Sequence, residues 1–311
     1  MNHVYDLATI QLDQPSVVTI GVFDGVHRGH QHLIQRLVRS ARESGRLAVV
    51  LTFFPHPDVV LRGLTGRYYL TSPQQRAELM GELGVDHVIT LPFSEEFRQI
   101  RAAAFVDLTR EHLKLESLWV GADFALGYKR EGTVEFLRAQ GAEKGFTLEA
   151  IDLVGEDGSA TFSSTAIRDA LNAGDLEAAR RLLGRSYSVS GEVVHGDHRG
   201  RTIGFPTANI AVWSEQLVPA NGVYAGWATV GGEHYMAVTN VGLRPTFEGD
   251  SLRVEAHLLD FNRDIYGETM NFSFETRLRP EKKFNGIQEL MAQIALDAQA
   301  GRDYLTANPH P

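Results

Sequence analysis

The sequence predicts an α/β module, built on a parallel β-sheet with helices on both faces, followed by a small antiparallel β-barrel and a closing helix. Strand-like and helix-like segments alternate through the first half of the chain. From residue 187 the segments are short, strand-like and separated by Gly, Pro and Asn. An apolar stripe at helical spacing then closes the chain. We therefore expect two domains, over residues 1–184 and 185–311.

Length and composition limit the class of protein. A chain of 311 residues can bury two cores, and 43% hydrophobic with 22% charged residues is ordinary for a globular protein. The first 14 residues carry two aspartates and no basic cluster, which argues against a signal peptide. No apolar run is long enough to cross a bilayer. The absence of cysteine excludes disulfides and thiolate chemistry and is typical of a cytoplasmic protein.

The net charge of −9 argues against nonspecific nucleic-acid binding, which requires a basic surface. An anionic small substrate is still allowed, because local cations, backbone N–H groups or a metal ion can outweigh the overall sign. The charge therefore favours a small-molecule partner over a nucleic acid or a membrane.

The elements of the first half follow from hydrophobic periodicity. Four apolar runs have the length and β-branched content of buried strands: Val17–Ile20, Leu47–Phe54, His87–Leu91 and Leu118–Val120. Helical spacing appears between them in three segments: Gln31–Ser44, Pro73–Leu83 and Ala102–Leu113. This alternation is typical of βαβ units, whose parallel strands bind ligands beyond their carboxyl ends. Two short helices follow, over Ser163–Asn172 and Asp175–Leu183, and a glycine ends each of them.

The most informative stretch of the first half runs from Gly21 to His30 and reads Gly-Val-Phe-Asp-Gly-Val-His-Arg-Gly-His. It joins a predicted strand to a predicted helix. Glycines let a ligand approach the backbone closely, and a helix N-terminus offers unpaired N–H groups to an anion. His27 and His30 are three apart and can face the same ligand. A phosphate uses all these features. The alternatives are a zinc site, which lacks an evident third ligand, and a turn without any ligand.

Polar residues also follow two other predicted strands. Two prolines direct the chain out of the strand that ends at Phe54, which places His56 and Pro57 at its carboxyl end. Asp123 and Phe124 follow the strand Leu118–Val120. The Asp123 carboxylate has two interpretations, binding a ligand hydroxyl or capping a helix.

A run of hydroxyl groups begins the first of the two short helices. Ser164 and Thr165 stand at its start, and Arg168 lies one turn further on. The hydroxyls can cap the helix. Together with the free N–H groups and Arg168, they can also hold a polyphosphate.

The second half is predicted as an antiparallel sheet or small barrel. Its strand-like runs are Tyr187–Val194, Gly222–Val230, His234–Thr239, Arg253–Phe261 and Thr269–Leu278. The apolar stripe that closes the chain is Phe284, Ile287, Leu290, Met291 and Ile294. We expect this stripe to form a helix that packs on the barrel.

Two segments of the second half carry candidate chemistry. Gly196, Gly200 and Gly204 alternate with Arg199 and Arg201, which indicates either a loop that wraps phosphates or an ordinary barrel turn.

Thr207 and Asn209 follow that loop, and their oxygens are of the kind that Mg²⁺ binds. The strand Arg253–Phe261 alternates polar and apolar residues. Its candidates are Glu255, His257 and Asp260, and a solvated strand face is the alternative for each of them.

These motifs together resemble bacterial FAD synthetases, the bifunctional riboflavin kinase/FMN adenylyltransferases. The first stretch resembles the His-x-Gly-His motif of nucleotidyltransferases in the longer form Gly-x-Phe-Asp-Gly-x-His-x-Gly-His. Thr-Phe-x-Pro-His-Pro, Val-Gly-x-Asp-Phe and Ser-Ser-Thr-x-Ile-Arg follow in order, as do Gly-Phe-Pro-Thr-Ala-Asn and Glu-x-His-x-x-Asp-Phe. Phe162 departs from the family's Ile, and Ala125-Leu126 departs from its Arg-Phe.

For the first half, the resemblance implies a Rossmann-like nucleotidyltransferase domain that adenylylates FMN to FAD with ATP and releases pyrophosphate. It implies that His27 and His30 are catalytic. The residues that it assigns to ATP and its phosphates are Phe23, Asp24, Gly25, His27, His30, Asp123, Ser164, Thr165 and Arg168. Those that it assigns to the flavin are His56, Pro57 and Phe124.

For the second half, the resemblance implies a riboflavin kinase barrel that makes FMN from riboflavin and ATP. Glu255 is implied as the general base, and Thr207 and Asn209 as ligands of Mg²⁺. The residues assigned to ATP here are Gly196, Arg201, Gly204, Thr207 and Asn209. The partners implied are ATP, riboflavin and FMN, without nucleic acid or membrane, and weak self-association is allowed.

Three alternatives to this interpretation make different demands on the sequence. A class I aminoacyl-tRNA synthetase-like protein would need a lysine-bearing loop, which the segment 163–168 lacks, and a basic surface. A flavin-binding protein without catalysis would be expected to have lost some of the reactive residues, and all are present. In the third alternative only one of the two modules is active.

Overall fold

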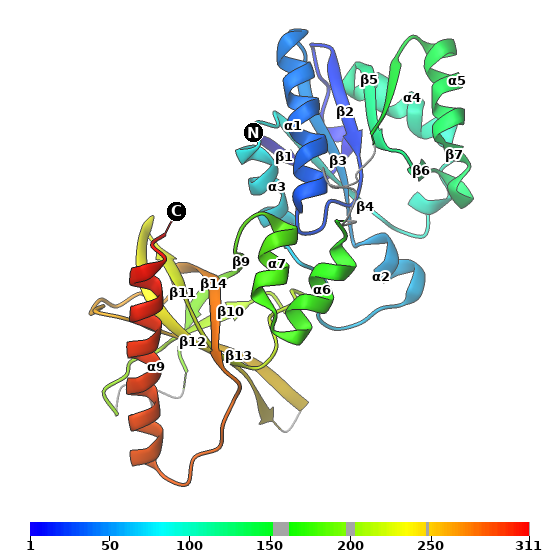
Figure 1. Ribbon diagram of the computed structural model, residues 1–311. Coiled ribbons are helices and arrows are strands. Elements are labelled where there is room, and N and C mark those ends of the chain that lie inside the picture. Colours follow the sequence, from blue (N-terminus) through cyan, green and yellow to red (C-terminus); the bar gives the residue numbers. More distant parts are fainter. Residues whose placement is uncertain (152–161, 197–202, 247–248, 311) are drawn as a thin grey trace. The chain divides into compact units, whose positions relative to one another are not determined.

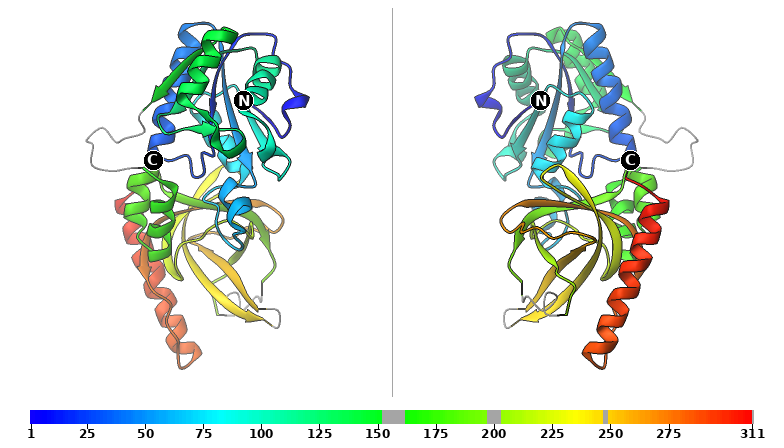
Figure 2. Two further views of the ribbon diagram at one scale, coloured as in Figure 1. Left: turned by 90° about the vertical axis from the view of Figure 1, so that its right-hand side faces the viewer. Right: turned by 90° about the vertical axis from the view of Figure 1, so that its left-hand side faces the viewer.

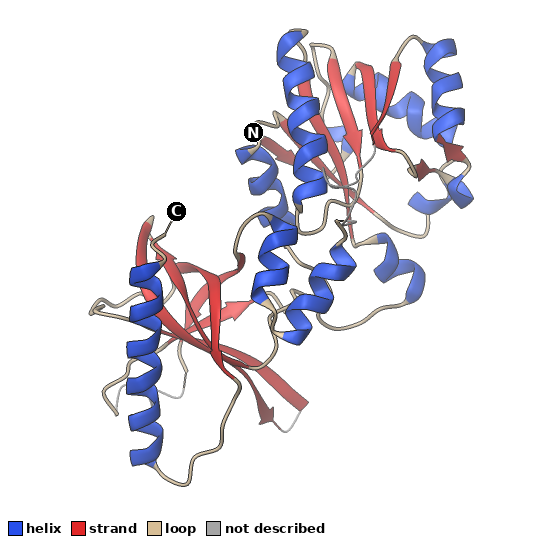
Figure 3. Cartoon of the chain, in the orientation of Figure 1, coloured by secondary structure: helices blue, strands red, loops and turns tan. Residues whose placement is uncertain are grey.

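The computed structural model describes residues 1–151, 162–196, 203–246 and 249–310. Contacts divide the chain into two compact units, and each is described by itself. The first consists of Met1–Thr65 and Thr71–Ser164, and the second of Gly66–Leu70 and Thr165–Pro311. Figure 3 shows the change from alternating strands and helices in the first unit to mostly strands in the second.

The first unit is built on a six-stranded sheet in the order β1-β4-β3-β2-β5-β8, and every neighbouring pair is parallel. The strands are β1 (Asn2–Val4), β2 (Ser16–Ile20), β3 (Leu47–Phe54), β4 (His87–Pro92), β5 (Leu115–Gly121) and β8 (Thr147–Ile151). A two-stranded hairpin of β6 (Ala125–Leu126) and β7 (Gly132–Thr133) follows β5. The central strands are buried on both faces, which is the usual state of a parallel sheet.

Helices cover both faces of this sheet (Figure 1). They are α1 (Arg28–Glu43), α3 (Pro73–Glu82), α4 (Ala102–Leu113) and α5 (Val134–Lys144), whereas the short helix α2 (Pro57–Arg62) follows β3 and has no buried residue. Apolar residues of α1 and α3 form one core with alternate residues of the strands, Val17 among them. Residues of α4 and α5 form a second core with the intervening residues, such as Val18. Successive side chains point to opposite faces, so each strand contributes to both cores.

The strand order reverses at β2, and this places a ligand site. β3 and β4 lie to one side of β2, whereas β5 and β8 lie to the other. A crevice therefore opens beyond the carboxyl ends of β2 and β5, where an open α/β sheet binds its ligands. The stretch Gly21–His30 leaves the sheet at β2, and Asp123 follows β5.

The second unit is a closed barrel in the order β10-β13-β12-β11-β14-β9, with antiparallel neighbours throughout (Figure 2). Its strands are β9 (Tyr187–Val194), β10 (Ala208–Val212), β11 (Gly222–Val230), β12 (Glu233–Thr246), β13 (Gly249–Leu258) and β14 (Thr269–Arg279). Two helices precede it, α6 (Ser164–Ala173) and α7 (Leu176–Leu183), and α9 (Ile287–Ala307) closes the chain.

The barrel is filled from inside and packed against α9 from outside. Tyr224 of β11 and Phe272 of β14 are fully buried in the interior, which also takes in apolar residues of α6 and α7. The alternate residues of β11, Ala225 and Trp227, face outward and contact Leu305 of α9.

These findings confirm the predicted fold class. Most predicted elements agree with the structure to within a few residues, although α1 begins three residues before its predicted start. The prediction missed β1, β8 and β10, together with α2, α5 and the short hairpin. These are short elements or ones with weak apolar patterns. The burial pattern of β8, for example, has only one fully buried residue.

The closing helix is confirmed, and its predicted stripe is right in part. Phe284, Leu290 and Ile294 are half-buried and line a cavity with Val223 and Val238 of the barrel, whereas Ile287 is 60% and Met291 38% exposed. The helix packs through its second half, at Gly301 and Leu305. A Cβ at Gly301 would lie 2.5 Å from Val238 Cγ2, so only glycine allows the helix to approach β12 this closely.

This packing predicts different effects for two leucines of the same helix. Leu305→Ala should lower the free energy of unfolding by about 2–5 kcal/mol, because it leaves a cavity at a fully buried position. Leu296→Ala, at a residue 64% exposed, should change it by less than about 0.5 kcal/mol. Denaturant unfolding measures both values, and equal losses would contradict the assigned packing face.

Candidate active sites

The turn after β2 has an unusual backbone. Phe23, Gly25 and Val26 have positive φ angles of 53°, 80° and 40°. A β-branched residue such as Val26 rarely adopts this conformation. Both non-glycine side chains are nonetheless almost completely buried, with 2% exposure for Phe23 and 1% for Val26. Core packing therefore holds the turn in a strained form, which is a common property of functional loops.

The two histidines of this turn lie against each other. His27 is the N-cap residue of α1, and its Nδ1 accepts a hydrogen bond of 3.4 Å from the His30 backbone N–H. The rings are stacked, with centroids 3.5 Å apart and an angle of 15° between their planes. The Phe23 ring contacts His30 edge-on, at a centroid distance of 5.0 Å. Both imidazoles thus stand at a helix N-terminus, where an anion is favoured.

The His30 ring has a lowered pKa and one nitrogen without a hydrogen-bond partner among the described residues. Burial, the neighbouring His27 and the Arg76 cation together hold the pKa of His30 well below its ordinary value of 6.5. Its Nδ1 atom is buried, and no hydrogen-bond partner is found for it within the described parts of the chain. A buried ring nitrogen in this state is available to a ligand.

Asp24 and Ser164 support this turn from two sides. The Asp24 side chain is 1% exposed, and its Oδ1 accepts hydrogen bonds from the Thr71 backbone N–H (3.2 Å) and hydroxyl (3.3 Å). The Thr71 hydroxyl also accepts a bond from Gly25 N–H. The Ser164 hydroxyl donates to the Asp24 carbonyl at 2.8 Å. The structure thus brings Ser164 to the turn and directs the Asp24 carboxylate toward Thr71.

The sequence interpretation missed Thr71 as a supporting residue. Thr71 precedes Ser72, which caps α3 in a capping box with Gln75. A hydroxyl directly before a capping residue is expected to belong to the helix cap, so no pattern in the sequence links Thr71 to Asp24.

Thr165 and Arg168 belong to the second unit. The Arg168 Nε donates to the Tyr68 carbonyl at 2.8 Å, and its guanidinium lies 3.9 Å from the centre of the Tyr68 ring. Tyr68 is part of Gly66–Leu70, the short segment that the same unit contains.

The other predicted residues of the first unit lie at strand ends. His56 is the N-cap of α2 and accepts from Asp58 N–H at 3.0 Å, and Pro57 is the first residue of that helix. Asp123 is exposed, and its carbonyl accepts from Arg130. β6 and not a helix follows it, so the capping alternative for Asp123 is wrong. Phe124 packs at the edge of the core that α4 and α5 cover.

The candidate site of the second unit lies on the outer face of the barrel. Val254, Ala256 and Leu258 of β13 point inward, so Glu255 and its alternate neighbours point outward. Asn209 of β10 stands directly opposite Glu255 in the strand register. This register places an amide and a carboxylate from two strands side by side.

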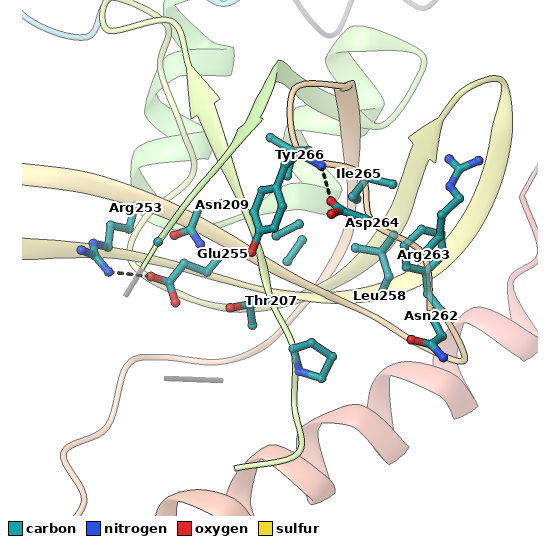
Figure 4. A pocket seen from close by; sticks show the side chains of 16 residues that line it. Thr207, Asn209, Arg253, Glu255, Leu258, Asn262, Arg263, Asp264, Ile265 and Tyr266 are labelled. Carbon is teal, nitrogen blue, oxygen red and sulfur yellow. Dashed lines mark hydrogen bonds and ion pairs between the residues drawn. The ribbon is translucent and has the colours of Figure 1, made fainter. Parts of the chain in front are cut away.

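A cavity of 350 Å³ covers this point (Figure 4). Thr207, Asn209, Glu255 and Tyr266 line it, and Arg253 donates to Glu255 Oε1 at 2.9 Å. Gly196 borders the cavity next to Asn209, and a Cβ at residue 196 would lie 2.3 Å from the Asn209 amide nitrogen. A glycine is therefore needed there for Asn209 to keep its position.

A second cavity, of 320 Å³, shares lining residues with the first. Apolar and aromatic side chains form part of its lining: Phe205, Val223, Val238, Phe284, Leu290 and Ile294. Polar and charged side chains form the rest, among them Asn240, His257, Arg279, Glu281, Lys282 and Asp297. Glu255 and Thr207 line both cavities. The exposed first half of α9 thus has a role that its sequence pattern did not show, because it forms one wall of this cavity.

The three candidates Glu255, His257 and Asp260 have different surroundings in the structure. The first two lie in β13, and Asp260 follows it. His257 lines the second cavity, and its Nδ1 lies 2.8 Å from the Pro206 carbonyl oxygen. Asp260 lines neither cavity and forms an ion pair of 2.6 Å with Arg302 of α9. Of these three candidates, Glu255 is the one that lines both cavities. Gly204 is exposed with a φ of 84°. Arg201, with Arg199 and Gly200, lies outside the described residues.

The described residues lack two kinds of feature, a metal-binding cluster and a membrane-spanning helix. They contain no group of three or more His, Cys, Asp or Glu side chains arranged to hold a metal ion. Within those same residues, no helix has the length and apolar character needed to cross a membrane.

Comparison with known proteins identifies the class. The family model of FAD synthetase matches residues 9–166, and that of riboflavin kinase matches residues 183–305. A bifunctional riboflavin kinase/FMN adenylyltransferase of Listeria monocytogenes is 42% identical over 94% of this chain and 93% of its own. The Escherichia coli K12 protein of that name is 39% identical over 93% and 92%. A crystal structure of a macrolide-efflux protein from Streptococcus pneumoniae has a TM-score of 0.85 at 31% identity, covering 96% of this chain and 98% of that one.

The fold and these matches define a transferase with a nucleotidyltransferase module before a kinase module. The chain belongs to the family of bifunctional riboflavin kinase/FMN adenylyltransferases. The resemblance seen in the motifs is therefore confirmed, and the alternative of an aminoacyl-tRNA synthetase-like protein is wrong.

The neutral state of His30 predicts a pH dependence of stability. Below pH 6.5 the unfolded chain protonates this histidine while the folded chain does not, so stability falls as the pH falls. The contribution is up to about 1.4 kcal/mol per pH unit. Denaturant unfolding between pH 7 and 5 should show a shallower dependence for His30→Asn than for the wild type. His32→Asn, an exposed control on the same helix, should keep the wild-type slope. Parallel curves for His30→Asn and the wild type would contradict the assignment.

Proposed function

We propose that residues 185–311 phosphorylate riboflavin to FMN and that residues 1–184 then adenylylate FMN to FAD, each with its own ATP. These two activities and their substrates are those of the family. The observation that carries the proposal is the position of Glu255, which borders both cavities at once. Transfer between two bound substrates needs a reactive group at such a junction.

The two cavities suit the two substrates of the kinase reaction. The isoalloxazine ring of riboflavin is flat and apolar, and the second cavity offers Phe205, Phe284 and aliphatic side chains. The triphosphate of ATP suits the first cavity, where Arg253, Thr207 and Asn209 supply polar groups. Glu255 would take the proton from the ribityl 5′-hydroxyl as its oxygen attacks the γ-phosphorus. The bond to the β-phosphate oxygen then breaks, and ADP leaves.

Magnesium is the metal that fits this site. The Thr207 hydroxyl and the Asn209 side-chain oxygen are neutral oxygen donors on the wall of the first cavity, and Mg²⁺ favours such donors together with substrate phosphates. The bound ion would neutralise phosphate charge. Gly196, Gly204 and Arg201, the last of which lies outside the described residues, are the other groups proposed to bind the ATP phosphates.

For the adenylyl transfer, an oxygen of the FMN phosphate attacks the α-phosphorus of ATP and pyrophosphate leaves. Charge neutralisation and positioning suffice for this step. His27, His30 and the N-terminus of α1 would stabilise the phosphates, on the turn shaped by Phe23, Asp24 and Gly25. The other ligands proposed for the nucleotide and its phosphates are Asp123, Ser164, Thr165 and Arg168. Those proposed for the flavin are His56, Pro57 and Phe124.

A cytoplasmic location and weak self-association belong to the same proposal. The absence of cysteine and the availability of ATP and flavins in that compartment support the location.

Incubation of the purified protein with riboflavin, ATP and Mg²⁺ tests the function as a whole. FMN and FAD should both appear on chromatography. If only FMN appears, the first module is inactive. If FMN and FAD are both absent, the proposal is contradicted.

Glu255→Gln should lower FMN formation about 10²–10⁴-fold, because it removes the general base and keeps the side chain's shape. FAD formation from supplied FMN should be unchanged. Glu192→Gln, an exposed control on β9, should leave both rates unchanged. Equal loss of both activities in Glu255→Gln would refute its role as a base.

His30→Ala should have the opposite effect. FAD formation from FMN should fall about 10²–10³-fold, since a group that stabilises phosphate charge is lost. Riboflavin phosphorylation by the same chain should continue at its normal rate. His32→Ala, on the exposed side of the same helix, is the matched control. Unchanged FAD synthesis in His30→Ala would remove His30 from the site.

A further inference from the structure

A buried arginine, Arg76, lies in the first unit without a place in the proposed chemistry. It stands in the first turn of α3 and is only 1% exposed. Arginine is rarely buried this completely, because removing a guanidinium from water is costly. The sequence signal is slight, since Arg76 directly precedes the buried Ala77 in a helix that also buries Met80.

Arg76 contacts the chain at the carboxyl ends of two strands. Its Nη1 donates to the Val22 carbonyl (2.5 Å), to the Thr52 hydroxyl (3.1 Å) and to the Phe53 carbonyl (3.3 Å). The Thr52 hydroxyl also donates to the Val22 carbonyl at 2.8 Å. One guanidinium nitrogen thus joins the ends of β2 and β3.

These contacts are made where both functional segments leave the sheet. Val22 precedes Phe23, the first residue of the turn with a positive φ. The Phe23 ring in turn contacts His30, and it also lies over Gly21, where a Cβ would be 2.9 Å from the ring. Phe53 lies three residues before His56. A shift of Arg76 would therefore move the histidine turn and the segment that carries His56.

The cation also acts on the histidine directly. Among the described residues, the charged or titratable groups that influence His30 are His27 on its own turn and Arg76 from α3. Both lower the pKa of His30, after the larger effect of burial. The protonation state and the position of His30 thus depend on the same residue.

We propose that Arg76 is the positioning residue of the adenylyl-transfer site. By joining the ends of β2 and β3 it sets the geometry of the turn that carries His27 and His30, and it makes no contact with the reacting atoms. This inference rests on the proposed location of adenylyl transfer. It predicts a loss in turnover and not in substrate binding, because the histidines would still be present but displaced.

Arg76→Met and Arg76→Lys in the full chain test this. In Arg76→Met, kcat for FAD formation from FMN should fall about 100-fold, the cost of a displacement of about 1 Å, with KM for FMN and ATP within about threefold. Arg76→Lys keeps the charge but not the planar donor group, so its kcat should fall about 10-fold. Arg39→Met, the same change at an exposed residue of α1, should have no effect. Riboflavin phosphorylation should be normal in all three variants.

The NMR titration of His30 separates positioning from simple loss of structure. Its pKa should rise in Arg76→Met, which loses the cation, and stay low in Arg76→Lys. Wild-type kcat in either folded variant overturns the proposal, as does a rise in KM with kcat unchanged. If Arg76→Met does not fold, Arg76→Lys decides by the same criteria. Loss of activity in His30→Ala with none in the Arg76 variants overturns this inference alone, whereas normal activity in His30→Ala overturns the proposed site as well.

Discussion

Both modules depend on one constraint, that successive side chains of a strand point to opposite faces. In the first module helices cover both faces of the sheet, so no strand face is left for substrate, and the candidate residues gather at the carboxyl ends of β2, β3 and β5. In the second module the inner face of every strand fills the barrel. Glu255 and its neighbours therefore stand on the outer face, and α9 has to stand off the barrel to leave a cavity there.

Buried polar groups hold the first candidate site in shape. The turn after β2 has two non-glycine residues with positive φ, a conformation that costs about 1–3 kcal/mol each unless the surroundings impose it. The surroundings are the Asp24–Thr71 hydrogen bonds, the Ser164 hydroxyl and the Arg76 guanidinium. All of these partners are distant in sequence, so tertiary contacts hold the turn in this conformation. Its backbone cost is offset by packing and by these hydrogen bonds.

The combination of the two modules in one chain makes chemical sense, because FMN is the product of the second and the substrate of the first. Both reactions bring phosphates together, yet the two sites solve the problem differently. The proposed adenylyl-transfer site combines a helix N-terminus with two stacked imidazoles. The proposed kinase site combines neutral oxygens with a carboxylate beside an arginine, which would suit a hard cation and a proton to be removed.

The sequence by itself determined the fold class, most strands and the identity of the candidate residues, because alternation, helical spacing and glycine positions are local properties. His27, His30, Thr207 and Asn209 became candidates in this way, and the family resemblance singled out Glu255 from His257 and Asp260. Only the tertiary structure showed that Asp24 faces Thr71, that Asp260 pairs with Arg302, and that Arg76 joins two strand ends. It also showed that the close packing of α9 on the barrel is made at Gly301 and Leu305, beyond the predicted stripe. Such facts depend on which distant segments meet, and no local pattern records those contacts.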